Sequence, residues 1–410
     1  MSAGTMLNRV LPVHGHVRTF LGIVLVLTLG QGLWMALNAV YSTTVLHLSA
    51  SQFGVGVGLA AGVALLLSTP SGHLADRIGP RRLQIWSLTA MGPLSAALLL
   101  VSGYPSYLVV VCTQAVAYSA SRSARLAMIA GLAPPEERVS ARAYMRTVSN
   151  VSATAGAGAA GVLLAVGSTT AYRAAVVVVS LAYLASGLLT LRLPTVPPQP
   201  PRPGPALVVL RDRPFLTFVV LDGLLSMHNM LLEVVLPLWV LHRTGAPRWV
   251  IAAIMLLNTV LVVVLQVRAS RGTDEPEAAA RAARGGALCV AAACVVFSLT
   301  EGASAVTASV LLLLGALAHV LGEVRQAAGS WGISFGLAPA YAQGQYQGTS
   351  FMGADIGKMI APALLTWLAI EHGTLGWLVM AIGFAVVGAA MSPVVAWARR
   401  SKEAAVPASG

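Results

Sequence analysis

Long apolar stretches, separated by short polar segments, make up most of the chain. Each stretch has about the 20 residues that a helix needs to cross a bilayer, so the pattern predicts transmembrane helices. We expect twelve of them, at about residues 19–46, 51–75, 83–102, 105–131, 139–166, 170–192, 215–241, 247–268, 284–301, 304–327, 346–370 and 374–397. Because backbone groups in lipid must be paired within a helix, the predicted fold class is an all-α membrane protein.

A proline-rich segment divides these stretches into two sets of six. The run LPTVPPQPPRPGP, residues 193–205, is unsuited to a helix interior, because each proline removes a backbone donor and clashes with the preceding turn. We therefore predict two six-helix bundles, at residues 1–192 and 215–410. A cytoplasmic linker at 193–214 is expected to join them.

The basic residues lie mostly at the ends of the apolar stretches, which predicts the orientation of the chain. With the N-terminus inside, the inner segments carry seventeen of the basic residues that flank the stretches, whereas the outer segments carry only three, Arg173, Arg243 and Arg248. Both termini are therefore expected in the cytoplasm. The abundance of arginine, alanine and glycine suggests a GC-rich bacterial genome, which makes a bacterial plasma membrane the expected location.

Composition narrows the possible function classes. Hydrophobic residues make up 57% of the chain and charged residues 10%, with a mean hydropathy of +0.78. This balance excludes a water-soluble enzyme. The net charge of +12 reflects membrane topology and does not form a hydrophilic surface for nucleic acid. No metal-binding pattern, nucleophile elbow or phosphate loop occurs, so we expect neither enzyme activity, metal nor cofactor.

One short loop carries a dense motif between the second and third predicted helices. Residues 72–82 read GHLADRIGPRR. Asp76 follows a helix end, where its carboxylate can meet a helix N-terminus or a nearby arginine. Gly72 permits close packing and Gly79 a tight turn. The basic residues of the loop, which we expect at the lipid headgroups, are Arg77, Arg81 and Arg82.

This loop resembles the signature of the major facilitator superfamily, G-x-L-x-D-R-x-G-R-R, at the same place between helices two and three. The residues that match in order are Gly72, Leu74, Asp76, Arg77, Gly79, Arg81 and Arg82. The resemblance implies the major facilitator fold over nearly the whole chain. It also implies that the loop latches the two halves closed on the inner side. The equivalent loop of the second half, RASRGTDEPEAAARAARGG, keeps basic residues and Gly272 but not the full pattern.

Two further loops resemble those of bacterial drug:proton antiporters. LAPPEERVSARAYMRTVSN, residues 132–150, is similar to the loop between helices four and five of that group. GLAPAYAQGQYQG, residues 336–348, is similar to the loop that leads into helix eleven. This resemblance implies efflux of drug-like organic molecules against a flow of protons.

Ionisable residues inside the apolar stretches are candidates for proton coupling, because such groups are costly in lipid. On a continuous seventh helix, Asp222, Ser226, Asn229 and Glu233 are spaced 0, +4, +7 and +11, which predicts one narrow polar stripe. A stripe with two carboxylates favours a face that lines a cavity. Hydrogen bonding to a neighbouring helix is the alternative.

The tenth and eleventh predicted helices carry two further pairs of ionisable residues. His319 and Glu323 are four positions apart and can touch. Asp355 and Lys358 are three positions apart, and Lys358 lies near mid-membrane. Each pair has two possible roles: coupling of a proton or substrate, or mutual neutralisation in a purely structural pair. The sequence does not decide between these roles. The candidates for the proton are thus Asp222, Glu233, Glu323, Asp355 and His319.

Polar faces on several helices are candidates for a substrate cavity. An aromatic and amide face suits an amphipathic organic ligand, although Trp34 and Tyr41 also suit packing. Arg125 is expected to reach the inner surface, and Arg142 to be a surface residue that only sets topology. The cavity candidates are Gln31, Trp34, Asn38, Tyr41, Gln114, Tyr118, Arg122, Arg146, Asn150, Ser226, Asn229 and Lys358.

These features together predict a monomeric secondary active transporter that works by alternating access. The first hypothesis is proton-coupled efflux of small organic molecules. The alternative is a proton-coupled symporter that imports a small metabolite, with Arg122, Arg125 and Arg146 facing the cavity. A non-transporting membrane receptor is a third class, but it gives no reason for several ionisable residues at membrane depth.

Overall fold

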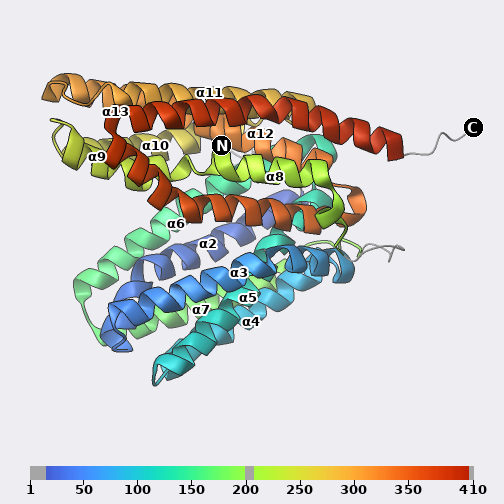
Figure 1. Ribbon diagram of the computed structural model, residues 1–410. Helices are drawn as coiled ribbons and strands as arrows, with labels where there is room; N and C mark the ends of the chain where they lie inside the picture. Colours follow the sequence, from blue (N-terminus) through green and yellow to red (C-terminus); the bar gives the residue numbers. More distant parts are fainter. Residues whose placement is uncertain (1–14, 199–206, 406–410) are drawn as a thin grey trace, which may run out of the picture. The chain divides into compact units, whose positions relative to one another are not determined.

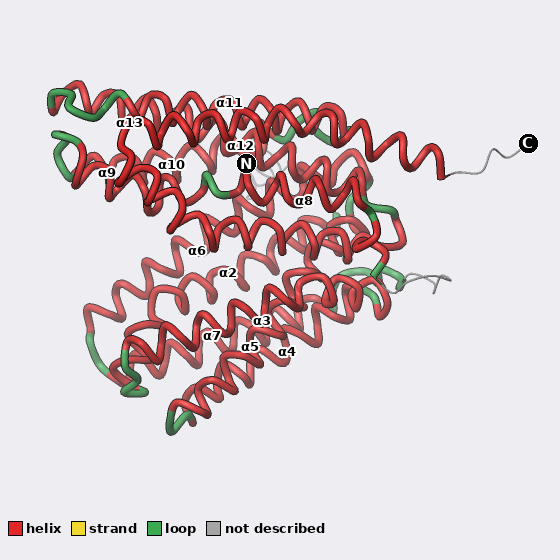
Figure 2. Tube along the Cα trace, viewed as in Figure 1, coloured by secondary structure: helices red, strands yellow, loops and turns green. Residues whose placement is uncertain are grey.

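Helices make up nearly all of the residues that the computed structural model describes, 15–198 and 207–405, and no strand occurs among them (Figure 2). Ten helical segments of this part are long and apolar enough to cross a membrane. The chain is therefore a multi-pass membrane protein. The elements before the proline-rich segment (Figure 1) are α2 (His16–Val40), the π-helical η1 (Tyr41–Val45), α3 (Ala50–Ile78), α4 (Pro80–Ala97), α5 (Tyr104–Leu132), α6 (Arg138–Val166) and α7 (Thr169–Thr190).

The second part of the chain begins with a 3-10 turn at Val208–Arg211. Helix α8 starts at Arg213, within the last two residues of the predicted linker, whose residues 199–206 lie outside the described part. The helices that follow are α8 (Arg213–Ser226), the π-helical η5 (Leu231–Val235), α9 (Leu236–Arg243), α10 (Trp249–Ala269), α11 (Pro276–Ser298), α12 (Ala305–Leu337) and α13 (Gln343–Ala405).

Local sequence signals account for several helix ends. Ser49 and Gln52 form a capping box at the start of α3, in which the Gln52 amide donates to Ser49 Oγ over 3.2 Å. The same helix ends at Gly79, whose φ of 90° is accessible to glycine, and Pro80 then opens α4. This glycine–proline step produces the tight turn that the sequence predicts between α3 and α4.

Several helices extend beyond the predicted spans, as α11 and α12 illustrate. α11 begins at Pro276, where the sequence predicts a start near 284, and α12 continues to Leu337, where it predicts an end near 327. Arg281 and Arg284 suggest a loop by their charge, yet they stand among alanines, which favour helix. Hydropathy identifies only the part of a helix that lies in lipid. Helices α11 and α12 extend beyond that part, so hydropathy places their ends too early or too late.

The predicted span over 215–241 corresponds to one helical segment of membrane length, Arg213–Arg243, but this segment is irregular after Ser226. The amides of Met227 and His228 donate to carbonyls three residues back, and a π-helical turn follows at η5. Asn229 Nδ2 donates to the carbonyl oxygen of Ser226 over 2.8 Å at the break. The stripe from Asp222 to Glu233 therefore does not follow one regular helix face.

Helix α13 contains the last two predicted spans on either side of a sharp bend. Gly373 at the bend has φ 56° and ψ −135°, a backbone conformation outside the helical region. Figure 1 shows the chain turning back on itself within α13. A Cβ at Gly373 would lie 2.9 Å from a carboxylate oxygen of Glu301, so glycine fits this position by space as well as by conformation.

The helices cluster into two compact units. Unit 1 comprises the described residues of Met1–Pro135, Tyr144–Leu207 and Ala340–Gly348, and unit 2 those of Glu136–Ala143, Val208–Pro339 and Thr349–Gly410. Each unit thus includes the first turns of a helix, α13 or α6, whose remainder belongs to the other unit. The domain boundaries at 192 and 215 stay a prediction.

Each unit has its own apolar core. In unit 1, Leu37, Leu88 and Tyr107 belong to one cluster of fully buried side chains. In unit 2, Trp377 packs against Trp239 and Phe297, with ring centroids 5.6 and 5.3 Å apart. Glycines bring α11 and α12 together, since a Cβ on Gly286 would lie 2.5 Å from the Gln326 amide nitrogen. This contact fixes the part of α12 that carries the polar site.

Candidate functional site

A buried carboxylate lies at the centre of the polar site in unit 2. Asp222, on α8, is only 7% exposed. One of its oxygens accepts hydrogen bonds from Gln326 Nε2, over 3.0 Å, and from Ser330 Oγ, both on α12. Arg142 and Lys358 lie within electrostatic reach of the carboxylate. Asp222 is therefore surrounded by donors and positive charges.

Two histidines extend this hydrogen-bonded cluster. His228 Nε2 lies 3.4 Å from Gln326 Oε1, and His228 Nδ1 lies 3.3 Å from His319 Nε2. The two imidazole rings meet edge to face, with centroids 5.1 Å apart, and both residues are 1% exposed. The chain Asp222–Gln326–His228–His319 thus joins one carboxylate and two imidazoles, which can take up or release a proton, through the amide of Gln326, which donates and accepts hydrogen bonds.

The other ionisable candidates of unit 2 lie around this chain. Glu323 is buried, and its Oε2 accepts a hydrogen bond of 2.9 Å from Asn258 Nδ2 on α10. Glu233 is exposed and lies within electrostatic reach of Lys358 and Glu323. Asp355 is half-buried on α13. Lys358 is thus the cation near both Asp222 and Glu233.

Arg142 corrects the expectation of a surface residue. Its side chain is buried, at 8% exposure, and its guanidinium lies 5.0 Å from the ring centroid of Trp331. The rings of Phe335 and Phe351 follow at 5.7 and 5.5 Å. Three aromatic faces can replace part of the water that a buried guanidinium loses. The position of Arg142 in the sequence, near the start of α6, does not predict that its side chain is buried.

Sequence reasoning missed Gln326, Ser330, His228 and Asn258 as members of the site. A signal for the first two was present, because His319, Glu323, Gln326 and Ser330 repeat the 0, +4, +7, +11 spacing along α12. His228 had no such signal, because only the break after Ser226 brings its side chain to His319.

Several cavity candidates of unit 1 make internal contacts. Tyr41 is 1% exposed, its hydroxyl donates to the carbonyl oxygen of Leu98 over 3.1 Å, and its ring meets Trp34 at 5.8 Å. Tyr41 is therefore a packing residue. Gln114 Nε2 donates to Ser95 Oγ over 3.3 Å. The candidates that are only partly buried are Gln31, Trp34, Asn38, Gln114, Arg122, Arg146 and Asn150, and Tyr118 is exposed.

The signature loop of unit 1 contacts the start of α13. The Asp76 carboxylate, 8% exposed, accepts hydrogen bonds from the amides of Gly344 and Gln345 over 2.7 and 3.0 Å. Unpaired amides and the positive end of the helix dipole make a helix N-terminus a favourable partner for a carboxylate. Gly72 and Gly344 allow this approach, since a Cβ on either would clash with the backbone of the other.

The arginines of the loop differ in their surroundings. Arg81 donates from Nη2 to the carbonyl oxygen of Leu191 over 2.6 Å, at the C-terminal end of α7, where a cation is favoured. Arg77 and Arg82 are exposed. Arg81 thus anchors the loop to α7, and the other two remain available to headgroups.

The equivalent loop of unit 2 contains a carboxylate that the sequence comparison did not single out. Asp274 accepts a hydrogen bond from the backbone amide of Val139, in the first turn of α6. Like Asp76 in the other unit, Asp274 accepts an amide hydrogen bond from the first turn of a helix. Because this loop lacks the full signature, the role of Asp274 as an acceptor at a helix start is assigned from its hydrogen bond with Val139 and not from the sequence. Burial raises the pKa of the Asp274 carboxyl above its ordinary value, although the Val139 hydrogen bond opposes the rise.

Replacing Asp274 by Asn should therefore change how stability depends on pH. A raised pKa in the folded protein means that the ionised form carries a cost, which is relieved as pH falls through that pKa. The uncharged Asn keeps an acceptor for Val139 without this cost. We expect Asp274→Asn to melt above the wild type at pH 8, with a difference that shrinks toward pH 5. A constant difference across this range would contradict the burial of the charge.

The described residues hold no cluster of three or more His, Cys, Asp or Glu side chains placed to bind a metal ion. The site is thus built from carboxylates, amides, imidazoles and cations.

A sequence profile of the Major Facilitator Superfamily matches residues 19–362. The match covers most of the chain, so the protein belongs to this family of membrane transporters, which are not enzymes in general. Its helices have the family fold. No curated protein sequence matches the chain significantly.

Solved structures share the fold at low sequence identity. A bacterial homologue of the iron transporter ferroportin, in an outward-facing state, is 13% identical with a TM-score of 0.73, covering 94% of this chain and 100% of that one. The transporter FucP in the outward conformation is 14% identical with a TM-score of 0.67, covering 93% and 98%. The human organic anion transporter MFSD10 (TETRAN) is also 14% identical, with a TM-score of 0.67 and coverage of 92% and 98%. At these identities the comparison establishes fold alone.

Proposed function

We propose that the protein is a secondary active transporter that couples the movement of a small organic molecule to protons. The observation that carries the proposal is the buried chain from Asp222 through Gln326 and His228 to His319. Titratable groups at membrane depth are costly, and where they occur they mark a pathway or a coupling site. In a chain that belongs to a transporter family, a proton-linked step is the use that this cluster fits best.

The cations near Asp222 suggest how a proton and a substrate compete. Arg142 and Lys358 both lie within electrostatic reach of the carboxylate. Protonation of Asp222 removes one negative charge and leaves these cations less neutralised. A substrate that interacts with Lys358 therefore experiences a different electrostatic field when Asp222 is protonated and when it is ionised. Its affinity then differs between the two states, and coupling requires such a difference.

Twelve transmembrane helices in two six-helix bundles, with both termini in the cytoplasm, are the topology that this proposal uses. Asp76 and Asp274 each hold the first turn of a helix, α13 and α6 respectively. Breaking these two contacts and remaking them would accompany alternating access. Small organic substrate, protons and lipid are the proposed partners of a monomer, with no nucleic acid and no cofactor.

Efflux of drug-like molecules is the direction we propose first, and it rests on the resemblance of residues 132–150 and 336–348 to loops of drug:proton antiporters. The alternative is import of a metabolite by proton symport. Two solved structures with a similar fold support the symport alternative. They are the Escherichia coli fucose:proton symporter FucP, at 15% identity, and the proton:xylose symporter XylE, at 12%.

Transport in proteoliposomes under an imposed pH gradient separates the two directions. For an antiporter, a cationic dye such as ethidium should leave the compartment toward the side with more protons, because protons return in exchange. For a symporter, a sugar or organic anion should move with the protons. Proton-driven ethidium exchange supports efflux. Proton-driven sugar or anion uptake without dye exchange would establish the alternative, and binding of a protein partner without any transport would overturn both.

A further inference from the structure

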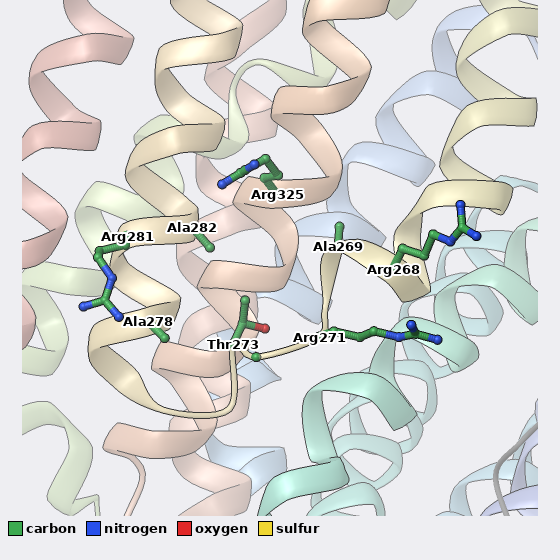
Figure 3. Close-up of a pocket in the computed structure, with 9 residues that line it drawn as sticks. Arg268, Ala269, Arg271, Thr273, Ala278, Arg281, Ala282 and Arg325 are labelled. Atoms are coloured by element: carbon green, nitrogen blue, oxygen red, sulfur yellow. The ribbon is translucent and has the colours of Figure 1, made fainter.

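A pocket of about 380 Å³ opens in unit 2 between the end of α10, the start of α11 and an internal part of α12. Arginine side chains from these three helices and from the loop after α10 line it, and Gly272, Thr273 and small alanines form the rest of its wall. Figure 3 shows two of the arginines extending to one side of the pocket and two to the other. The four are Arg268, Arg271, Arg281 and Arg325.

These arginines gather positive charge that the neighbouring carboxylates do not neutralise. All four are exposed, and Arg268, Arg271 and Arg325 form no ion pair with any described carboxylate. Arg281 alone lies within electrostatic reach of Glu277, which itself pairs with Arg399. Asp274 accepts the Val139 amide. The pocket therefore keeps an uncompensated positive field.

The packing of α11 on α12 gives Arg325 a defined place in this pocket. A Cβ on Gly285 would lie 3.5 Å from Arg325 Nη2, so the guanidinium lies over a glycine of the adjacent helix. An arginine that only sets membrane topology does not require such a contact with an adjacent helix. The pocket volume also falls in the range of small-ligand sites.

The pocket lies at the depth of lipid headgroups. Arg325 is 20 residues beyond Ala305, the first residue of α12, or about 30 Å along the helix, which is the thickness of the hydrocarbon core. Arg268 stands in the last turn of α10, a helix of 21 residues and the same length. The arginines thus reach the membrane boundary opposite the starts of both helices.

We infer that this pocket binds a phosphate group, supplied by the headgroup of an anionic phospholipid. Planar guanidiniums recognise phosphate oxygens through paired hydrogen bonds, and exposed arginines can turn toward such a ligand. A basic pocket between transmembrane helices is a suitable headgroup site. Because Gly272 and Thr273 line the pocket next to Asp274, its occupant also holds the loop that contacts α6.

Thermal unfolding of the purified protein in neutral detergent tests the inference. The probes are dioleoylphosphatidylglycerol, the zwitterionic dioleoylphosphatidylcholine, sn-glycerol 3-phosphate and inorganic phosphate. We expect phosphatidylglycerol to raise the melting temperature more than phosphatidylcholine does. In the double variant Arg268→Gln/Arg325→Gln, the phosphatidylglycerol concentration needed for half the effect should rise roughly thirtyfold.

The control is Arg192→Gln/Arg211→Gln, which removes two arginines outside the pocket and should respond like the wild type. If the pocket variant does not fold, Arg271→Gln alone gives the same test with a rise of about fivefold. Arginine-dependent stabilisation by glycerol phosphate or inorganic phosphate, without a lipid effect, would keep the phosphate site but assign it to a soluble anion. Equal responses of wild type and pocket variants, or no response to any probe, would overturn the inference.

Discussion

Replacing Asp222 by Asn should abolish proton-driven transport while leaving substrate exchange intact. Asn keeps the size of the side chain and an acceptor oxygen for Gln326 and Ser330, but it cannot take up a proton. A pH gradient of one unit can drive about tenfold accumulation for each coupled proton, because one unit corresponds to 1.36 kcal/mol. This accumulation should vanish in the variant, whereas exchange of labelled for unlabelled substrate at equal pH should continue.

The matched control is Asp355→Asn, which removes a carboxylate that is only half-buried on α13. We expect it to keep most of the proton-driven accumulation. Glu233→Gln and Glu323→Gln in the same assay rank the remaining carboxylates. Wild-type accumulation in Asp222→Asn, with normal amounts of folded protein in the vesicles, would remove Asp222 from the coupling step.

Replacing Asp76 by Ala should release the start of α13 and slow transport. The change leaves the amides of Gly344 and Gln345 without their acceptor, and each unpaired buried amide costs roughly 1–3 kcal/mol. The conformation that contains this contact is destabilised by that amount relative to one that lacks it. Amide hydrogen exchange in a peptide covering 340–348 should rise by about tenfold or more, together with a lower transport rate.

Asp212→Ala is the control for the loss of a helix cap outside the signature loop. Asp212 Oδ1 accepts the Phe215 amide over 3.0 Å at the start of α8, so its removal should cost about 1 kcal/mol and raise exchange only near α8. Transport should stay near the wild-type rate. If Asp76→Ala and Asp212→Ala behave alike in both measurements, the Asp76 contact is an ordinary cap and not a latch.

The helices and the signature loop were predictable because their signals are local. Hydropathy over 20 residues marked most of the long described helices, and the glycine–proline step at Gly79 marked the turn between α3 and α4. Helix ends outside lipid were less predictable, as the extensions of α11 and α12 show. Neither hydropathy nor helical periodicity detected the break after Ser226, because the apolar pattern continues through it.

The candidate site was predictable in its residue types but not in its partners. The sequence pointed to Asp222, Glu323 and His319 by their charge or polarity within apolar stretches. It gave no reason to join Asp222 to Gln326, which stands 104 positions away, or to place Arg142 among aromatic rings. Nor did it distinguish Tyr41, a buried packing residue, from the polar candidates beside it.

The sequence by itself determined that this chain is a multi-pass membrane protein with the signature of a transporter family. These properties follow from the free energy of moving apolar segments into lipid and from residues close together in the chain. Only the tertiary structure decided which polar groups meet. The contact of Asp76 with Gly344 joins residues 268 positions apart. Such contacts depend on how helices pack, and packing is set by shape and not by the order of residue types.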